Sequence, residues 1–422
     1  MSDSALDEII PLGETGDYIN GIGFKESDWN GAGLPIIRIQ NLTNEEKPFN
    51  FTSREVDEKY HVRNGDILVS WSATLDAFVW RRGPALLNQH IFKVVPRQDS
   101  IDPRFLYYQL KSIIYSMSRG EHAHGSTMKH INRKPFLAHP FWRPCLEKQE
   151  EIGQWLDAQF SGLDETERTL QAIQAKIKQA RASILKAAVE GRLVETDIPW
   201  STKPLRELLA EPMRNGKSAK TSTSGKGVRI ATLTAVTANQ FTESNTKPAD
   251  LDPSELDDLW LQPEDIFVQR SNAPELVGSS AMYSGQPNWA IFPDLLIRVR
   301  CSPEILPKWM LANLQAPSTR RYFKENAKGS SGSMPKISQS IIAEAVIACP
   351  SLKDQEATLE EIERRFTVLD QVEATVNASL RRCGQLRQAM LKSAFGGVKR
   401  SRSEAGSSLG LGISLRPPSS AS

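Results

Sequence analysis

The sequence predicts a mixed α/β protein made of two related globular domains, each followed by a long helix, with the two helices packed as an antiparallel coiled coil. Two observations lead to this fold. The chain contains an internal repeat, and a seven-residue apolar period runs through the most regular part of each copy. At 422 residues the chain is also too long for one ordinary core, so two or three domains are expected.

The repeat covers almost the whole chain. Phe160, Leu163 and Asp164 in QFSGLDE match Phe366, Leu369 and Asp370 in RRFTVLD, and the same offset of 206 residues continues to about Gly191 and Gly397. Earlier matches follow the same order but with varying spacing: Pro11-Leu12 with Pro204-Leu205, Asn20-Gly21 with Asn215-Gly216, Arg38-Ile39 with Arg229-Ile230, Asp66-Ile67 with Asp265-Ile266, Phe105-Leu106 with Trp309-Met310, and Ile131 with Ile337. Loops tolerate length changes and packed elements do not, so each copy is predicted to be a loop-bearing domain followed by a rigid element.

These matches set the predicted domain boundaries. The expected segments are a first globular domain at 1–143, a first long helix at 144–195, a second globular domain at 196–347, a second long helix at 348–398 and a disordered tail at 399–422. The tail is rich in Ser, Gly and Pro, which is typical of disorder. Residues 213–227 are expected to form a basic loop or linker.

The rigid element is predicted to be a helix because its apolar residues recur every seventh position. The repeating residues are Leu156, Leu163, Leu170, Ile177 and Ile184 in the first copy, and Ile362, Leu369, Val376, Cys383 and Met390 in the second. Phe160 and Phe366 are expected to pack at the same seam. A polar helix of this length needs a partner, and its own copy is the expected one. Asp164 and Asp370 could be solvated or could bond a neighbour.

The globular domains are predicted to be mixed α/β from short local patterns. IIRIQ, DILVSW, HIFKVV, DIFVQR and LLIRVRC are β-rich runs, while PRFLYYQLKSIIYSMS and PKWMLANLQ have helical apolar spacing.

Composition indicates a soluble globular protein, with 39% hydrophobic and 24% charged residues. A formal net charge of +2 neither demands nor excludes nucleic acid, because binding depends on a local basic face. The sequence contains no apolar run long enough to span a membrane and no basic leader, and its cysteines are scattered. A reduced, cytoplasmic protein without membrane contact is expected.

The search for catalytic motifs argues weakly against an enzyme. GKSAKTSTSGKG lacks the P-loop spacing, and His122 and His124 lack further ligands at metal-binding spacing. No nucleophile and base can be paired, and none recurs in the second copy. No metal site is therefore expected, and the repeat favours a duplicated binding scaffold.

Basic and amide side chains in loop contexts are the candidate DNA contacts, since they can neutralise phosphates or read base edges. They are Arg81, Arg82, Lys129, His130, Asn132, Arg133 and Lys134 in the first domain, and Arg214, Lys217, Arg270, Asn272, Lys328 and Lys336 in the second. Each could equally be an ordinary solvated charge. The Gly/Ser-flanked basic segments GSTMKHIN and GSSGSMPKIS, which precede the two helices, favour the DNA interpretation jointly.

The order of these motifs resembles the specificity subunit of Type I restriction-modification systems. DYINGIGFKESDW, GLPIIRIQNLT, GDILVS, GPALLNQHIFKV and KQEEIGQWLDAQFSGLDE carry the resemblance, together with the second copy of the last at 355–397. The second domain departs from the first, because RSNAPELVG replaces WSATLDAF. Such divergence fits two domains that read different sequences.

The resemblance implies a non-catalytic subunit that binds double-stranded DNA. Each domain would read one half of a split target, and the paired helices would fix the spacing between the halves. Two methyltransferase (modification) subunits and the motor-nuclease (restriction) subunits would be its partners. S-adenosylmethionine, ATP and Mg²⁺ would belong to those partners, so no cofactor is expected in this chain. A coiled-coil protein-interaction scaffold without DNA binding is the alternative, and an unrecognised nuclease is a third possibility.

Overall fold

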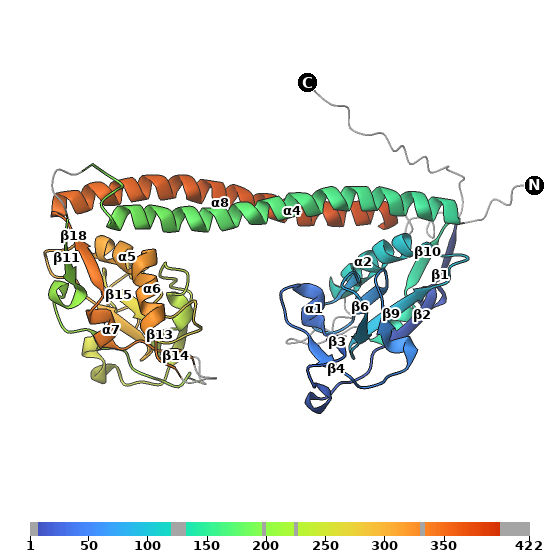
Figure 1. Ribbon diagram of the computed structural model, residues 1–422, viewed down its shortest axis with the longest axis horizontal. Helices are drawn as coiled ribbons and strands as arrows, with labels where there is room; N and C mark the ends of the chain where they lie inside the picture. The colour runs from blue at the N-terminus through green and yellow to red at the C-terminus, as the bar shows by residue number, and fades with distance from the viewer. Residues whose placement is uncertain (1–6, 120–131, 196–199, 223–226, 330–333, 397–422) are drawn as a thin grey trace, which may run out of the picture. The chain divides into compact units, whose positions relative to one another are not determined.

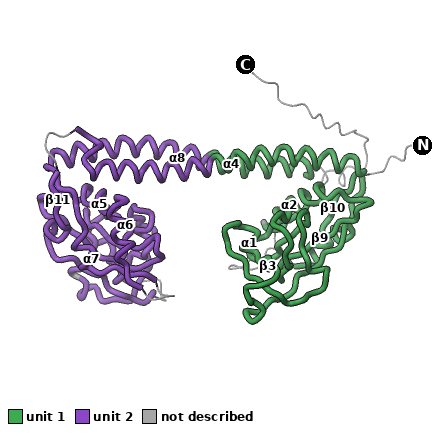
Figure 2. The backbone as a smooth tube through the Cα atoms, viewed as in Figure 1, with its two compact units in different colours: residues 1–169, 379–422 green, residues 170–378 purple. Residues whose placement is uncertain are grey.

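The chain folds into two compact units, and the predicted mixed α/β fold class is confirmed (Figure 1). The computed structural model describes residues 7–119, 132–195, 200–222, 227–329 and 334–396. Unit 1 contains residues 1–169 and 379–422, and unit 2 contains residues 170–378 (Figure 2). None of the described helices is long and apolar enough to cross a membrane.

Unit 1 contains three sheets. One is antiparallel in the order β2-β9-β6-β7, the second has the order β4-β3-β8-β5 with β3 and β8 parallel, and β1 pairs with β10. The strands are β1 (Glu8–Pro11), β2 (Gly16–Asn20), β3 (Leu34–Ile37), β4 (Asn50–Thr52), β5 (His61–Val62), β6 (Ile67–Ser70), β7 (Asp76–Val79), β8 (Ala85–Leu87), β9 (Ile91–Pro96) and β10 (Pro140–Arg143). The shorter helices are α1 (Ile39–Thr43), α2 (Pro103–Arg119) and α3 (Arg133–Leu137).

Unit 2 repeats this topology. Its antiparallel sheet has the order β12-β17-β15-β16, β13 pairs with β14, and β11 pairs with β18. The strands are β11 (Ser201–Pro204), β12 (Arg214–Asn215), β13 (Val228–Ala231), β14 (Thr246–Ala249), β15 (Ile266–Gln269), β16 (Ser280–Met282), β17 (Leu296–Val299) and β18 (Val346–Cys349). The shorter helices are α5 (Pro307–Gln315), α6 (Pro317–Asn326) and α7 (Gln339–Ala343). Single bridges from Ile291 to Ile230 and Trp260 stand where β8 joins β3 and β5.

The central strand of each main sheet is buried on both faces, so its side chains serve two cores. In β6, Ile67 and Val69 join the core that contains α2, while Leu68 joins the core of the second sheet. In β15, Ile266 and Val268 join the core that contains α5, and Phe267 points into the other core. This follows from the alternation of side chains along a strand.

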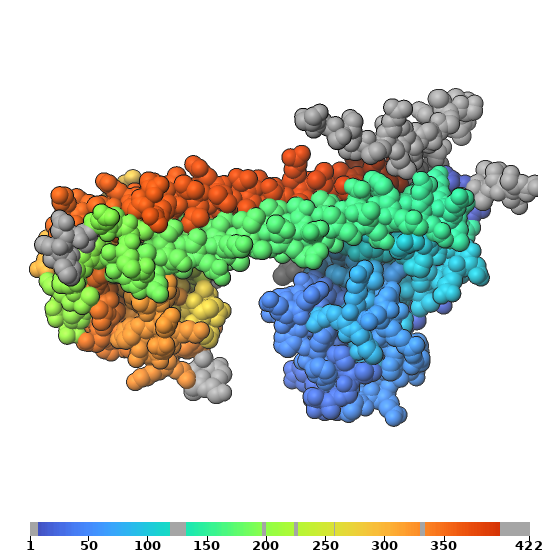
Figure 3. Space-filling view, turned by 45° about the horizontal axis from the view of Figure 1, so that its top comes forward, coloured from blue at the N-terminus to red at the C-terminus, as the bar shows by residue number. Residues whose placement is uncertain are grey.

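The two long helices, α4 (Leu146–Val189) and α8 (Leu352–Phe395), pass from one unit to the other and pair antiparallel within each. In unit 1, Leu156 and Phe160 near the start of α4 share a core with Leu391 and Phe395 near the end of α8. In unit 2, Leu185 near the end of α4 shares a core with residues from the start of α8. Figure 3 shows the side chains of α4 and α8 packed against each other.

All of the predicted seam residues are buried or half-buried. Leu156, Phe160, Ile177, Ile362, Val376 and Cys383 are buried, and Leu163, Leu170, Ile184, Phe366, Leu369 and Met390 are half-buried. Phe160 and Met390 belong to the unit 1 core, and Ile184, Ile362 and Phe366 to the unit 2 core. The heptad period therefore marks the helix face that is turned toward the partner helix and the globular core.

Two matching ion-pair clusters account for the repeated aspartates. The Arg181 guanidinium donates to Asp370 at 2.5 Å and to Glu373 at 2.9 Å, and it lies over the ring of Phe366. Arg387 binds Asp164 and Glu167 in the same way and lies over Phe160. The two clusters occupy equivalent places in the repeat. They fix one pairing register in both units, although partly exposed ion pairs each contribute only about 0.2–1 kcal/mol.

A buried glutamine joins the start of each long helix to its globular core. Gln149, which is 1% exposed, accepts from Asp102 N at 3.0 Å and donates to the carbonyls of Ser100 and Pro144. Gln355, which is 0% exposed, makes the equivalent three bonds to Leu306 N, Glu304 O and Pro350 O. These amides satisfy backbone groups at the helix entrance that would otherwise be buried without a partner.

Replacing Gln149 with leucine is expected to lower the free energy of unfolding by about 2–4 kcal/mol, because three buried backbone groups lose their partner. Gln355→Leu should have a similar effect, and Gln154→Leu at an exposed position of α4 should change the stability little. Urea denaturation followed by tryptophan fluorescence measures all three. Equal stabilities for Gln149→Leu and Gln154→Leu would contradict the bridging role.

Several local predictions need correction. IIRIQ is not one strand, because β3 ends at Ile37 and α1 begins at Ile39. The segment 213–227 is not simply a linker, since its start forms β12 at the edge of the main sheet, where Asn215 pairs with Ile297. The first helix ends at Val189 rather than at 195, because Gly191 turns the chain with φ +68°. The tail at 399–422 lies outside the described residues.

Candidate nucleic-acid interface

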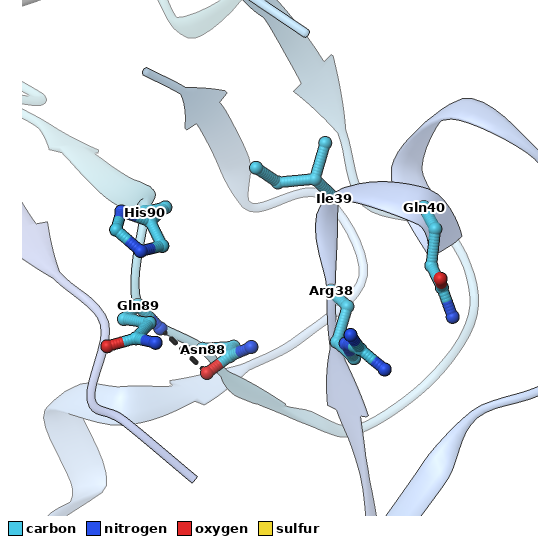
Figure 4. A pocket seen from close by; sticks show the side chains of 6 residues that line it. All are labelled: Arg38, Ile39, Gln40, Asn88, Gln89 and His90. Atoms are coloured by element: carbon cyan, nitrogen blue, oxygen red, sulfur yellow. Dashed lines mark hydrogen bonds between the residues drawn. The ribbon is translucent and has the colours of Figure 1, made fainter. Parts of the chain in front are cut away.

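A small cavity of about 220 Å³ lies in unit 1, where β3 and β8 end side by side (Figure 4). Because β3 and β8 are parallel neighbours, the residues that follow them meet at one edge of the sheet. The lining residues are Arg38, Ile39 and Gln40 after β3, and Asn88, Gln89 and His90 after β8. Arginine and amide side chains are the types that read base edges in duplex DNA.

The backbone at Arg38 is fixed by a buried asparagine. Asn41 is 2% exposed, its Oδ1 accepts from Arg38 N at 3.1 Å, and its Nδ2 donates to Lys47 O and Pro48 O. The Arg38 guanidinium lies over the Trp29 ring at 5.5 Å, and no described carboxylate forms an ion pair with it. Its charge is therefore available to a ligand.

Asn88 is held close to β2 by a glycine. A Cβ at Gly21 would lie 2.0 Å from the Asn88 carbonyl oxygen, so only glycine allows this approach. Gly216 makes the equivalent approach to Phe292 and Pro293 in unit 2. The repeat of Asn20-Gly21 as Asn215-Gly216 is thus explained by close packing. The glycine after β2 packs against the loop before β9, and the glycine after β12 packs against the loop before β17.

Aromatic side chains lie beside the cavity at the end of β6. Trp71 N donates to His90 O at 3.2 Å, and the Trp71 ring lies 4.8 Å from the His90 ring and 5.9 Å from the Phe92 ring. His90 has φ +69° and Ala73 has φ +59°. Such left-handed conformations of residues other than glycine cost about 1–3 kcal/mol and cluster at functional sites.

Unit 2 presents different side chains at the same place. Arg270 N donates to Leu295 O at 2.8 Å, as Trp71 N does to His90 O, so Arg270 occupies the position of Trp71. Ile337 N donates to Arg270 O, and Lys336 pairs through its backbone with both Ser271 and Lys328. The structure therefore brings Arg270, Asn272, Lys328 and Lys336 together at the end of β15. These four were all predicted as DNA contacts.

An arginine anchors the loop that follows Arg270. Arg320 Nη2 donates to Glu275 O at 3.1 Å and to Ser279 Oγ at 3.2 Å, while Nη1 is buried without a partner among the described residues. Burial lowers the pKa of Arg320 to about 10. Unit 1 uses a charged pair in this region, because Lys111 donates to both carboxylate oxygens of Asp76 at 2.8 Å. The positive charge of Arg320 thus has no acidic counterpart in the described part of unit 2.

The other predicted residues that the structure describes fall into three groups. Arg82 is used internally, since its guanidinium donates to Asn41 O and Glu45 O and lies 4.3 Å from the Phe49 ring. Arg214 and Lys217 form ion pairs with Asp258 and Glu255. The remaining residues are exposed, namely Arg81, Asn132, Arg133 and Lys134.

Arg133 and Trp71 both lie against the buried Phe92 ring. The Nη2 of Arg133 donates to Tyr18 O at 3.2 Å, and its guanidinium lies 5.7 Å from the Phe92 ring that stacks on Trp71. Lys129 and His130 lie outside the described residues, and so do His122 and His124. In the part of the chain that the structure describes, no group of three or more His, Cys, Asp or Glu residues could hold a metal ion.

Sequence reasoning missed the cavity residues Arg38, Gln40, Asn88 and Gln89. The polar triplet Asn88-Gln89-His90, which lies between two apolar strands, was the sequence feature that could have indicated them. Arg38 was also aligned with Arg229, and the structure shows this alignment to be wrong. Arg38 directly precedes α1, and Thr232 directly precedes the short helix Leu233–Ala235. The backbone N–H three residues later donates to the carbonyl of Arg38 in unit 1 and of Thr232 in unit 2, so these two residues are equivalent.

Comparisons with known proteins give a consistent result. Residues 3–178 match the Type I restriction modification DNA specificity domain. The EcoBI specificity subunit of Escherichia coli is 24% identical over 92% of this chain and 85% of its own length. The EcoKI specificity subunit of Escherichia coli is 26% identical over 92% of this chain and 88% of its own length.

A solved structure from the type I restriction-modification system supports the same fold. It was described for complex assembly and conformational transition, and it covers 92% of this chain and 97% of the matched chain. The TM-score is 0.63 at 13% sequence identity, which shows likeness of fold alone. The domain match and the relatives that span nearly the whole chain together show that this chain is similar to Type I restriction-modification specificity subunits.

Proposed function

We propose that this chain is the DNA sequence-recognition subunit of a Type I restriction-modification complex. Each unit reads one half of a two-part target in double-stranded DNA. The observation that carries this proposal is that one topology occurs twice with different side chains at the same strand ends. Trp71 in unit 1 is replaced by Arg270 in unit 2, although both backbones make the same hydrogen bond.

The proposal gives the long helices the role of a spacer. The chain passes between the units only inside α4 and α8, and one pairing register holds in both units. The lengths of α4 and α8 therefore determine how far apart the two half-sites in the DNA are. Half-sites on one face of DNA are about one helical turn apart, or ~34 Å.

The chain acts within a larger assembly and performs no catalysis itself. Its partners are two modification subunits, which transfer the methyl group, and motor-nuclease subunits, which cleave DNA. S-adenosylmethionine, ATP and Mg²⁺ bind to those subunits. The relatives are named as specificity subunits of Type I restriction enzymes, which supports a role as one part of a larger enzyme.

Mapping the methylated bases of a host that carries this chain with its modification subunits tests the proposal. A two-part motif with a spacer of fixed length is the expected result. A protein-interaction scaffold without DNA binding would leave no such motif. An unbroken motif would contradict the reading of one half-site by each unit.

Raising the salt concentration from 50 to 200 mM is expected to weaken binding of the assembled complex to its DNA by about a thousandfold or more. Basic side chains such as Lys134, Lys328 and Lys336 are exposed, and contacts with six or more phosphates give a loss of roughly this size. Fluorescence anisotropy with a labelled duplex measures the affinity. A change of less than about threefold over this range would contradict an interface based on phosphate contacts.

A further inference from the structure

The unit 1 cavity presents two hydrogen-bond donors next to each other. Arg38 carries donors only. The Oδ1 of Asn88 accepts from Gln89 N at 2.9 Å, so its Nδ2 remains as the free donor of the amide (Figure 4). Both side chains are half-buried in the cavity wall, between the more exposed Gln40 and Gln89. A ligand edge that pairs with both donors must offer two acceptors side by side.

Guanine is the base whose major-groove edge meets that requirement. Its N7 and O6 are both acceptors, whereas adenine and cytosine each present an amino donor and thymine presents one acceptor beside a methyl group. We infer that Arg38 and Asn88 are specificity-determining residues that read a guanine in the half-site bound by unit 1. This inference rests on the proposed function, because it assigns one base of the target to named residues.

The two donors are held in place before any ligand arrives. Asn41 fixes the backbone of Arg38, and the Trp29 ring lies against its guanidinium. Gly21 lets β2 approach the carbonyl of Asn88 closely. Groups that are already fixed lose little conformational freedom on binding, which favours discrimination between bases over mere attraction.

A phosphate group is the other acceptor-only partner, and the comparison of the two units argues against it. Phosphate contacts carry no sequence information, so a change of target sequence between the units does not require them to change. In unit 2, Thr232 stands in the place of Arg38 before the short helix. Leu86 pairs with His61 in unit 1, and Ile291 pairs with Trp260 in unit 2, so Leu86 and Ile291 are equivalent. Two residues further along the chain, Pro293 therefore stands in the place of Asn88. The donor pair therefore occurs in only one of the two units, as expected for a base contact.

The test uses the full chain with its modification subunits in a host without other methylation, and maps the methylated motif by sequencing. Arg38→Lys keeps the charge but cannot form the two parallel bonds to guanine. We expect methylation to spread to sites with other bases at one position of one half-site. The preference for guanine over the other bases should fall by about tenfold or more, and the second half-site should not change.

Two further variants complete the design. Asn88→Ala removes the second donor and should relax the same base position as Arg38→Lys. Thr232→Ala, at the equivalent place in unit 2, should leave that position unchanged. Thermal unfolding of each variant shows whether the fold is retained. Where Arg38→Lys is less stable, Asn88→Ala still decides the outcome.

The outcomes separate this inference from the proposed function. A wild-type complex that gives no two-part motif would contradict the proposed function itself. A wild-type motif that Arg38→Lys and Asn88→Ala both leave unchanged would overturn the guanine assignment alone. A uniform loss of methylation at all sites, with the base preference intact, would overturn it too and would assign the cavity to a phosphate.

Discussion

Exchanging residues 1–143 for the corresponding segment of a different specificity subunit is expected to replace one half of the methylated motif completely and to leave the other half and the spacer as they were. The physical reason is that the cavity residues and Trp71 all lie within this segment. The side chains at the end of β15 in unit 2 are untouched by the exchange. Sequencing of methylated DNA from cells that carry the chimera reports both halves at once.

The junction of this chimera has to preserve a mixed core. Phe105 of unit 1 packs against Phe395 with ring centroids 5.5 Å apart, and Leu156 and Leu391 belong to the same core. The donor segment must therefore carry a large apolar residue at position 105, because a residue as small as alanine would lose packing worth about 3–5 kcal/mol. The reciprocal exchange of residues 196–347 is the matched control, and it should change only the other half. Simultaneous change of both halves in either chimera would contradict independent reading by the two units.

The long helices were predictable because their signal is local and repeated. An apolar residue every seventh position requires no knowledge of the fold, and the same period in two copies identifies the partner. The helix 307–315 was also predictable, since its boundaries are marked by Pro307 and by the end of the apolar spacing. Asp164 and Asp370 could not be assigned, because their partners Arg387 and Arg181 are on the other helix, far away in sequence.

The candidate site was only partly predictable, because its parts meet through long-range strand pairing. Arg270, Asn272, Lys328 and Lys336 were found from composition, and the structure brings them together. The cavity of Arg38 and Asn88 was missed, since it exists only because β3 and β8 are parallel neighbours. Arg82 shows the opposite error, in which a residue predicted to contact DNA is used inside the domain. Its sequence context resembles that of a DNA contact, yet its donors are used by Asn41 O and Glu45 O.

The error in aligning Arg38 with Arg229 has a simple physical origin. The Arg-Ile pair occurs once directly after β3 and once inside β13, and sequence matching aligned the identical letters. Hydrogen bonding instead aligns the residues before the two short helices, which are Arg38 and Thr232. The arginine that the sequence match assigned to both units therefore occurs at this position only in unit 1. The guanine assignment depends on this difference between the units.

Inserting four residues after Thr169 in α4 alone is expected to abolish the assembly or to change the spacer of the methylated motif. Four residues add about 6 Å of helix and are not a multiple of the heptad. The pairing of Gln174 with Asn377 and of Arg387 with Glu167 then cannot be kept on both sides of the insertion. Co-purification of the modification subunits and motif sequencing measure the two possible outcomes.

Inserting seven residues after both Thr169 and Ala378 is the matched control, because a whole heptad in each helix keeps the apolar seam and both ion-pair clusters. This variant should assemble normally, and its motif should keep both half-sites. Its spacer should lengthen by about three base pairs, since seven residues add about 10 Å and each base pair rises 3.4 Å. A double insertion that assembles and methylates the original motif with an unchanged spacer would contradict the spacer role of the helices. Loss of assembly in the double insertion but not in the single one would contradict the pairing register on which that role depends.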